Sequence, residues 1–354
     1  MAAIPTEEQC TYYRRNIQGS RFTTRLTKYT TSIPPLSGTQ SVLIRVQAVS
    51  LNYRDANILN GTNPWPTLPN GIPCSDAAGC VLAVGSDVVD FVVGDRVMPI
   101  FDQKNLTGLE QERAWLGGEI DGVLATHLVF DEQKLVKVPE CLSYDEAACL
   151  PCAGVTAWSA VAVEGSVKSK VSVLVQGTGG VSLMAMKLAS AAGCRVIVTS
   201  STSKKLQRAE RMSAGPPIST INYQMIPNWH EEVVRRNGGK GVDIVFENGG
   251  MSSIMQSLQA AAVHGIISQV GYLGQQNPSL LEGFVPLLIE RAITLRGINL
   301  GSKQDFIAMN RLIAATELRF HDVIDKVFGM EDAAAAMEYV WSGNHIGKVV
   351  IKMS

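Results

Sequence analysis

The sequence lacks the features that mark several classes of protein. No run of about 18 apolar residues, the length of a membrane-spanning helix, occurs in its 354 residues. The formal net charge is -1, and no basic block suggests a nucleic-acid or anionic-membrane partner. Low-complexity segments and internal repeats are also missing. We therefore expect a globular protein that binds a small molecule, with no nucleic-acid and no membrane partner.

Signals for secretion and for disulfide bonding are missing too. The first residues, MAAIPTEEQC, lack the basic and apolar regions of a signal peptide, so we expect a cytoplasmic protein. The 7 cysteines, an odd number over a long chain, do not resemble the disulfide framework of a short secreted domain. Cys149 and Cys152 have the spacing of a thioredoxin-type redox motif, but that motif requires its own fold. We expect reduced thiols and no redox centre.

The length and the patterns that are present predict two domains in an α/β fold. Residues 1–145 contain short β-branched runs such as SVLIRVQAV, punctuated by Pro and Gly, which predict mostly antiparallel strands. From 146 to 300, apolar strands such as VSVLVQ and VDIVFE alternate with helical patterns, as in a doubly wound parallel sheet. Residues 301–354 return to a helix, a strand, an Ala-rich helix and a final strand. The parallel-sheet domain is therefore expected to be inserted between the two parts of the other.

A glycine turn between strand and helix, in VSVLVQGTGGVSLMAMKLASAAG, is the strongest chemical signal. Gly177 permits a tight turn, and Gly179 lets the backbone approach a pyrophosphate. Gly180 completes the turn, and the helix that begins near Val181 supplies unpaired N–H groups and the positive end of its dipole. Ser182 stands where the G-x-G-x-x-G fingerprint has Gly or Ala. Such turns also occur for packing alone, but the strand, helix and next strand favour dinucleotide binding.

The end of the next strand, in RVIVTSSTSKKLQR, indicates which dinucleotide. NAD sites usually have an acid there for the ribose 2′-hydroxyl, whereas the first acid here is Glu210. Ser200 and Ser201 offer hydroxyl donors instead, and Lys205 beside Lys204 supplies charge for a 2′-phosphate. Alternatively the lysines are a solvated first helical turn, although cations there oppose the helix dipole unless an anion lies nearby. We expect NADP(H) as the cofactor.

Several segments carry a family resemblance. In chain order they read LNYRDANILNG, PCSDAAGCVLAVGSDVVDFVVGDRV, CLPCAGVTAW, GTGGVS, INY and HIGKVVIK. Together they resemble the medium-chain dehydrogenase/reductase superfamily over nearly the whole chain. The resemblance implies a GroES-like catalytic domain around a Rossmann domain, and a homodimer formed through the edge of the Rossmann sheet. It is nearest to the zinc-independent branches, the quinone oxidoreductases and the enoyl reductase domains of polyketide synthases.

Zinc ligands separate the branches of this superfamily. The zinc alcohol dehydrogenases take Cys, His and Cys from segments like these and leave the fourth position open. By the same resemblance, Asn52 and Ser75 stand at the first two positions, Asp76 replaces a glutamate, and only Cys152 remains. Cys74 could add a second thiol, which is still too few ligands. The stretch FDQKNLTGLEQERAWLGGEIDG has none of the four cysteines of a structural zinc lobe. We expect no metal.

Without a metal, the site must polarise its substrate through hydrogen bonds. This favours acceptors that spread the developing charge, such as an α,β-unsaturated carbonyl or a quinone. Tyr53, Asn52 and Asp55, in the segment that faces the nicotinamide in relatives, are the candidate catalytic residues. In the alternative interpretation Asp55 pairs with Arg54 or Arg96, and Tyr53 only packs.

The resemblance also implies cofactor contacts outside the glycine turn. These residues are Thr156, Tyr223, Asn248, Gly271, Leu273 and Lys348. Alternatively, Thr156 is a helix N-terminal hydroxyl, Gly271 a turn glycine and Lys348 a surface charge. We predict an NADPH-dependent, zinc-free oxidoreductase that transfers hydride to an activated acceptor. The alternatives are an alcohol dehydrogenase or ketoreductase on the same scaffold, and a non-catalytic NADPH-binding protein.

Overall fold

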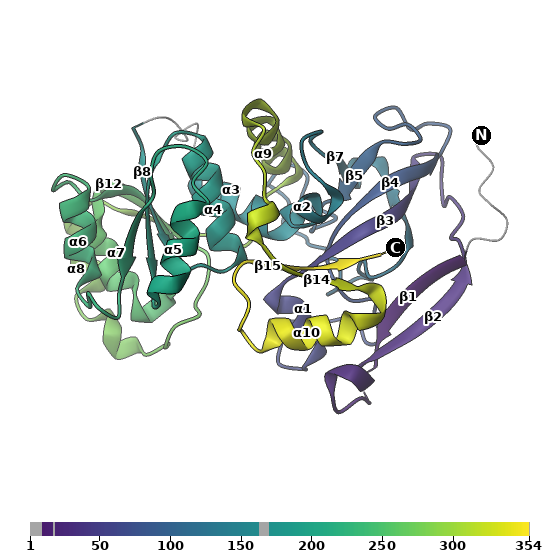
Figure 1. The fold of residues 1–354 in the computed structure, drawn as a ribbon, viewed down its shortest axis with the longest axis horizontal. Coiled ribbons are helices and arrows are strands. Elements are labelled where there is room, and N and C mark those ends of the chain that lie inside the picture. Colours follow the sequence, from purple (N-terminus) through teal and green to yellow (C-terminus); the bar gives the residue numbers. More distant parts are fainter. Residues whose placement is uncertain (1–8, 17, 163–169, 354) are drawn as a thin grey trace. The chain divides into compact units, whose positions relative to one another are not determined.

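The computed structural model describes residues 9–16, 18–162 and 170–353, which form two compact units (Figure 1). The first unit runs up to Val155 and resumes at Ser302, and the second runs from Thr156 to Gly301. The α/β fold class expected from the sequence is confirmed. The first boundary, expected after residue 145, lies ten residues later at 155, because the segment in between packs on the sheet of the first unit.

The first unit is built on a seven-stranded sheet. Its strands, together with a separate hairpin of β1 and β2, are β1 (Gln9–Arg15), β2 (Leu26–Ser32), β3 (Ser41–Leu51), β4 (Asp76–Val84), β5 (Arg96–Pro99), β6 (His127–Asp131), β7 (Leu135–Lys137), β14 (Ile324–Gly329) and β15 (Lys348–Lys352). The order is β14-β15-β3-β4-β5-β7, with β6 also paired to β3. Every pair is antiparallel except β14 with β15, so the mostly antiparallel prediction is confirmed.

Strand β3 is the centre of this unit. It pairs with three strands, and its run of β-branched residues is buried on both faces for most of its length. Four helices accompany the sheet: α1 (Tyr53–Leu59), α2 (Tyr144–Ala148), α9 (Lys303–Thr316) and α10 (Ala333–Trp341). The small residues of α10 let it pack closely against α1 and the sheet. The C-terminal segment is thus an integral part of the first unit.

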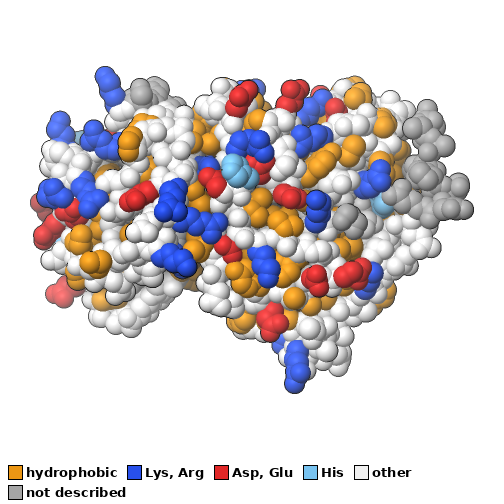
Figure 2. All heavy atoms as spheres, in the orientation of Figure 1, with side chains coloured by type: hydrophobic (Ala, Val, Ile, Leu, Met, Phe, Trp, Pro, Cys, Tyr) orange, Lys and Arg blue, Asp and Glu red, His pale blue; other side chains and the backbone are white. Residues whose placement is uncertain are grey.

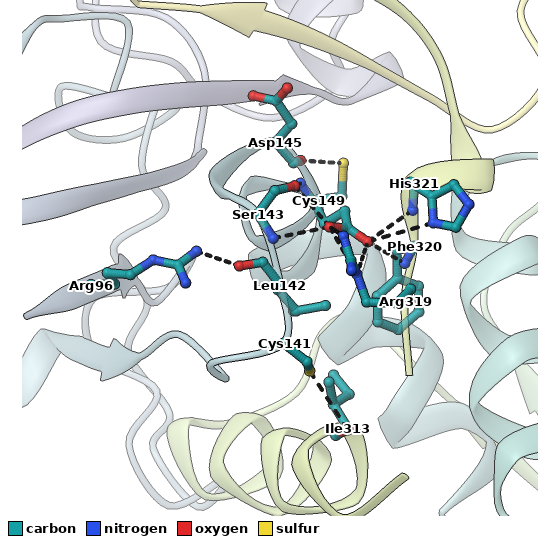
Figure 3. A network of polar contacts seen from close by, with 11 residues as sticks. Arg96, Cys141, Leu142, Ser143, Asp145, Cys149, Ile313, Arg319, Phe320 and His321 are labelled. Carbon is teal, nitrogen blue, oxygen red and sulfur yellow. Dashed lines mark hydrogen bonds and ion pairs between the residues drawn. The ribbon is translucent and has the colours of Figure 1, made fainter. Parts of the chain in front are cut away.

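A buried carboxylate, Glu146 on α2, ties the two sequence segments of the first unit together. Its partners Ser143, Arg319, Phe320 and His321 are labelled in Figure 3. Its Oε1 accepts hydrogen bonds from Arg319 Nε at 3.0 Å and from the backbone N–H groups of Phe320 and His321 at 2.8 and 3.0 Å. Its Oε2 accepts from Arg319 Nη2 and from the Ser143 hydroxyl, both at 2.8 Å. The chain that leaves for the second unit is therefore fixed to the chain that returns from it.

The second unit is a six-stranded parallel sheet in the order β10-β9-β8-β11-β12-β13. The strands are β8 (Ser172–Gln176), β9 (Arg195–Ser200), β10 (Ser219–Asn222), β11 (Val242–Glu247), β12 (Ala261–Gln269) and β13 (Thr294–Gly297). The helices are α3 (Val155–Val161), α4 (Gly180–Ala191), α5 (Ser203–Arg211), α6 (Trp229–Arg236), α7 (Ile254–Ala260) and α8 (Phe284–Glu290). Figure 1 shows α4 and α5 on one face of the sheet, with α6, α7 and α8 on the other. The predicted doubly wound sheet is confirmed.

Strand β8 lies at the point where the strand order reverses. The chain runs from β8 through α4 to β9 on one side, and β11 pairs with β8 on the other. Ligands of open parallel sheets bind outside the carboxyl ends of the strands at such a point. The glycine turn follows β8 directly, so the topology places it where a nucleotide is expected.

No helix within the described residues is both long enough and apolar enough to cross a bilayer. Figure 2 shows basic and acidic side chains scattered together over the face in view. This mixture agrees with the near-zero formal net charge of -1.

Candidate functional site

The turn after β8 has the conformation that its glycines predict. Gly177 has φ +82°, a left-handed conformation that other residues rarely adopt. A Cβ on Gly179 would meet no atom within 4 Å, so the space in front of the turn is open. No side chain caps α4, whose first residues are Gly180 and Val181. The turn therefore presents an open helix N-terminus suited to a phosphate.

Ser182, which departs from the glycine fingerprint, has a clear structural role. Its hydroxyl donates a 2.8 Å hydrogen bond to the carbonyl of Gln176, the last residue of β8. The side chain is buried at 1% exposure, so this bond is shielded from water. Serine thus fixes the helix to the strand end instead of allowing the close contact that glycine permits.

A cavity of about 440 Å³ lies beside this turn, at the carboxyl ends of the strands. It is lined by Gln176, Gly177, Thr199, Tyr223, Trp229, Asn248, Gly249, Ser252, Ser253, Leu273 and Gly274. Four of the predicted cofactor residues, Gly177, Tyr223, Asn248 and Leu273, are therefore brought together. Gly271 adjoins them, because a Cβ there would lie 2.1 Å from Asn248 Oδ1. Apolar surface with a few polar groups is typical of a small-molecule site.

The residues expected to select the cofactor lie at the end of β9 and directly after it. They are Ser200, the last residue of β9, and Ser201 and Lys205, which follow it. Ser200 is buried, and its carbonyl accepts the N–H of the pocket residue Tyr223 at 3.1 Å. Lys205 lies half-buried in the first turn of α5. The first acid of this segment, Glu210, accepts a 2.5 Å hydrogen bond from the Thr220 hydroxyl. Positive charge and hydroxyl groups therefore dominate the end of β9.

A buried carboxylate beneath the pocket was not identified from the sequence. Glu247 ends β11 with 0% exposure. Its Oε1 accepts the N–H groups of Gly249 and Gly250 at 2.8 and 3.1 Å and the Ser253 hydroxyl at 2.5 Å. Its Oε2 accepts the Gln176 side-chain amide at 2.7 Å. A signal was available, since the apolar runs VLV and IVF in these two strands are each followed by one polar residue, Gln176 or Glu247, at the strand end.

In the first unit, Lys348 holds the predicted catalytic residue Asn52. The ammonium is 3% exposed and donates to Asn52 Oδ1 at 2.6 Å and to the carbonyl of Leu51 at 2.7 Å. The bond from Lys348 identifies this atom of Asn52 as the carbonyl oxygen, because an ammonium only donates. The surface-charge interpretation of Lys348 is wrong, since it is buried.

The hydrogen-bond chain continues from Asn52 to the segment before β4. Asn52 Nδ2 donates to Ser75 Oγ at 3.3 Å, and Ser75 Oγ donates to Asp76 Oδ1 at 2.7 Å. Asp76 Oδ2 accepts the Cys152 N–H at 3.1 Å and lies 3.9 Å from Lys348 Nζ. Burial raises the pKa of Asp76, and the nearby Lys348 ammonium opposes that rise. Asn52, Ser75 and Cys152, the three positions compared with zinc ligands in the sequence, are thus linked by hydrogen bonds through Asp76.

This set of residues does not fit zinc. Burial, followed by the charge of Asp76, raises the pKa of the Cys152 thiol to about 12, whereas zinc binds the thiolate. The amide of Asn52 and the hydroxyl of Ser75 are poor zinc ligands, and the Lys348 cation lies beside them. Within the described part of the chain, no group of three or more His, Cys, Asp or Glu side chains is placed to hold a metal ion.

The other two predicted catalytic residues lie at the start of α1. Asp55 caps this helix by accepting the Asn52 N–H at 2.8 Å, and its side chain is 2% exposed. Burial raises the pKa of Asp55 to about 6. Tyr53 is 52% exposed and stacks on Trp341 of α10, with ring centroids 5.6 Å apart. Asn52 and Asp55 therefore share one hydrogen-bonded site, whereas Tyr53 packs against the C-terminal helix.

In the part of the chain that the structure describes, Asp55 forms no ion pair with Arg54 or Arg96, the two arginines considered from the sequence. Arg96 instead donates to the carbonyl of Leu142 and stacks over Tyr144. Arg54 is half-buried, and its guanidinium lies 4.8 Å from the ring centre of Phe101 and 5.5 Å from that of Trp115. The single hydrogen bond recorded for Arg54 within the described residues, to Leu116, leaves most of its N–H donors available.

Thr156 and Lys348, both predicted cofactor contacts, are not among the residues that line the 440 Å³ pocket. Thr156 belongs to α3 and is 5% exposed, and Lys348 belongs to the first unit, where it binds Asn52.

Cys149, which has the spacing of a redox motif with Cys152, is fully buried and donates its S–H to the carbonyl of Asp145. Burial raises the pKa of this thiol to about 11, which makes it unreactive at neutral pH.

Comparison with known proteins shows similarity over both units. One family model, described as alcohol dehydrogenase GroES-like domain, matches residues 38–140, and another, described as zinc-binding dehydrogenase, matches 180–315. A zinc-type alcohol dehydrogenase-like protein of Schizosaccharomyces pombe is 38% identical over 91% of this chain and 93% of its own length. A quinone oxidoreductase of Pseudomonas aeruginosa is 30% identical over 67% of each chain. A crystal structure of a putative alcohol dehydrogenase from Sinorhizobium meliloti is 32% identical with a TM-score of 0.85, covering 98% of this chain and 99% of that one.

Proposed function

The chain belongs to the medium-chain dehydrogenase/reductase superfamily, and from this membership we propose that it is an NADPH-dependent reductase that works without zinc. The proposed acceptor is an α,β-unsaturated carbonyl or a quinone. The observation that carries the proposal is that Asn52 and Ser75, which by the family resemblance stand at zinc-ligand positions, are hydrogen-bonded to each other, and that Asn52 also binds the Lys348 ammonium. The similarity to a protein named quinone oxidoreductase supports the same class of substrate.

The residues of the first unit suit a reaction in which negative charge develops on oxygen. The bound nicotinamide cofactor supplies the hydride, and the conjugated acceptor spreads the resulting charge. The amide of Asn52 is held in one orientation by Lys348 and can present its N–H group to that oxygen. Arg54 offers further donors beside two aromatic rings that suit a planar acceptor. An unactivated alcohol would require a metal or a base to remove its proton.

NADPH is favoured over NADH by the residues at the end of β9. Lys205 and the hydroxyls of Ser200 and Ser201 suit a 2′-phosphate, and no acid is available for a 2′-hydroxyl, since Glu210 accepts from Thr220.

A cytoplasmic location is part of the proposal. It is supported by the seven cysteines, all of which are free thiols, as in a reducing compartment.

A substrate screen tests the proposal directly. We expect purified protein to oxidise NADPH with enones or quinones, but not with simple ketones, and to contain less than about 0.1 zinc per chain by elemental analysis. Chelators should leave the rate unchanged. Turnover of simple ketones or alcohols, or stoichiometric zinc, would favour an alcohol dehydrogenase. Tight NADPH binding without turnover over a broad panel would favour a non-catalytic binding protein.

We also propose a homodimer formed through β13, the edge strand of the parallel sheet. Leu295 on β13 is 39% exposed, and Val285 and Ile289 on the neighbouring α8 are 59% and 71% exposed. No residue of α8 is buried within the single chain, which leaves this apolar surface to a second copy. A free strand edge with apolar neighbours is a ready site for pairing.

Lysine on this surface is expected to separate the dimer. Ile289→Lys combined with Leu295→Lys places charge in the proposed interface, and light scattering after size-exclusion chromatography should then give the monomer mass. Val89→Lys is the matched control, because Val89 is 83% exposed on the other unit. A wild-type protein that is already monomeric at micromolar concentrations would show that the dimer proposal is wrong.

A further inference from the structure

We propose that Gln276 is a positioning residue for the nucleotide, because its side-chain amide ties together the two loops that line the 440 Å³ pocket. One loop follows β11 and the other follows β12. The proposal rests on the nucleotide-binding function proposed above and assigns it a residue that does not line the pocket. Its consequence is that the pocket is already formed before the cofactor binds.

The two loops run side by side for only a short distance. Leu273 N donates to the carbonyl of Asn248 at 3.1 Å, and Gly274 N donates to that of Gly249 at 3.0 Å. These bonds join the two segments that together contribute six of the eleven residues lining the pocket. Beyond them, Tyr272 and Leu273 are 61% and 75% exposed, so little apolar burial holds the second loop in place.

The side chain of Gln276 adds further hydrogen bonds between the two loops. Its Nε2 donates to the carbonyls of Tyr272, Gly274 and Gly249, at 3.0, 2.7 and 3.0 Å. Its Oε1 accepts the N–H of Met251 at 3.2 Å. Three carbonyl oxygens on one side and an N–H group on the other fix the orientation of the amide. The exposed side chain of Gln276 thus binds its own loop through Nε2 and binds the loop after β11 through both Nε2 and Oε1.

The backbone around Gln276 leaves room for this arrangement. Gly250 has φ +79°, and a Cβ there would lie 2.7 Å from Gln276 Oε1. A Cβ on Gly274 would lie 2.0 Å from Ser252 Oγ and 2.9 Å from the carbonyl of Gly249. The loops therefore approach as closely as they do because glycine stands on both sides.

The loop after β11 is held from opposite sides. Glu247 binds the N–H groups of Gly249 and Gly250 from beneath, inside the unit, whereas Gln276 binds the same loop from its exposed side. Holding both loops in their binding conformation lowers the ordering entropy that the cofactor must otherwise overcome. The amide acts through the loops, so its loss is expected to change cofactor affinity more than the chemical step.

Replacing Gln276 by glutamate gives a nearly isosteric test. The carboxylate cannot donate, and it places negative charge against three carbonyl oxygens, which pushes the loops apart. We expect the Kd for NADPH to rise about tenfold, with kcat at saturating NADPH within about twofold of wild type. Gln275→Glu is the control, since it adds the same charge one residue away at an exposed side chain with no recorded hydrogen bond within the described residues.

Fluorescence titration with NADPH and steady-state kinetics separate the outcomes. The proposal is supported if the Kd of Gln275→Glu for NADPH rises by less than about twofold and the midpoint of thermal unfolding is unchanged in both variants. It also requires faster deuterium exchange in residues 271–276 of Gln276→Glu. Equal Kd values for the two variants would overturn it. If Gln276→Glu fails to fold, Gln276→Ala decides, with a rise of about threefold expected and no rise overturning the proposal. Wild-type protein that binds neither NADPH nor NADH would overturn the proposed function and this inference together.

Discussion

Lys205→Glu is expected to weaken NADPH binding about thirtyfold while changing the Kd for NADH by less than about threefold. The side chain lies half-buried in the first turn of α5, directly after the strand that ends at Ser200. Reversing its charge replaces an attraction to the 2′-phosphate by a repulsion, and NADH has no phosphate there. Fluorescence titration with each nucleotide measures both constants.

Lys240→Glu is the matched control for this charge reversal. Lys240 is exposed and lies just before β11, at the amino end of the parallel strands, whereas the pocket lies at their carboxyl ends. It should therefore change neither constant by more than about twofold, because exposed charges farther apart than about 10 Å are screened by salt. If Lys205→Glu raised the Kd for NADPH and the Kd for NADH by the same factor, Lys205 would not be the residue that recognises the 2′-phosphate.

The parts of the fold that were predictable from the sequence are those set by local patterns. Apolar runs of the right length gave β8 and β11, and the glycines after Gln176 identified the turn, because a positive φ at Gly177 is a local requirement. The order of alternating strands and helices was sufficient to predict the parallel sheet. Each of these features depends on residues that are neighbours in the chain.

Contacts between distant residues could not be predicted in the same way. Lys348 binds Asn52, which lies 296 residues earlier in the chain, and no pattern in HIGKVVIK indicates that Lys348 is buried. The boundary between the compact units, at residue 155, differs from the expected 145 for a related reason, because the sequence of α2 does not show that Glu146 binds Arg319. Gln276 lies in a loop whose sequence, GYLGQQNPS, does not distinguish it from Gln275. Long-range partners were therefore the part that required the structure.

The second large effect is expected from Glu146→Gln, which should destabilise the first unit by about 3 kcal/mol at neutral pH. The carboxylate is 1% exposed and accepts hydrogen bonds from Arg319, Ser143 and the backbone after Arg319, which are the donors labelled in Figure 3. A side-chain amide in its place would turn an N–H group toward these donors. The Arg319 guanidinium would lose its partner as well. For a unit of this size, the midpoint of thermal unfolding should fall by roughly 6–12 °C.

The pH dependence distinguishes this network from ordinary packing. Burial alone would raise the pKa of Glu146, but the hydrogen bonds from Arg319 and Ser143 outweigh it and lower the pKa to about 2, from 4.5. Because the folded-state pKa is depressed, the stabilisation is complete above pH 4.5 and is lost as the pH falls toward 2. Urea unfolding at pH 7 and pH ~3 should therefore show a stability gap between wild type and Glu146→Gln that narrows in acid. Glu140→Gln, at an exposed position six residues away, should show no gap at either pH. A gap that stays constant with pH would mean that Glu146 contributes through its shape and not through its charge.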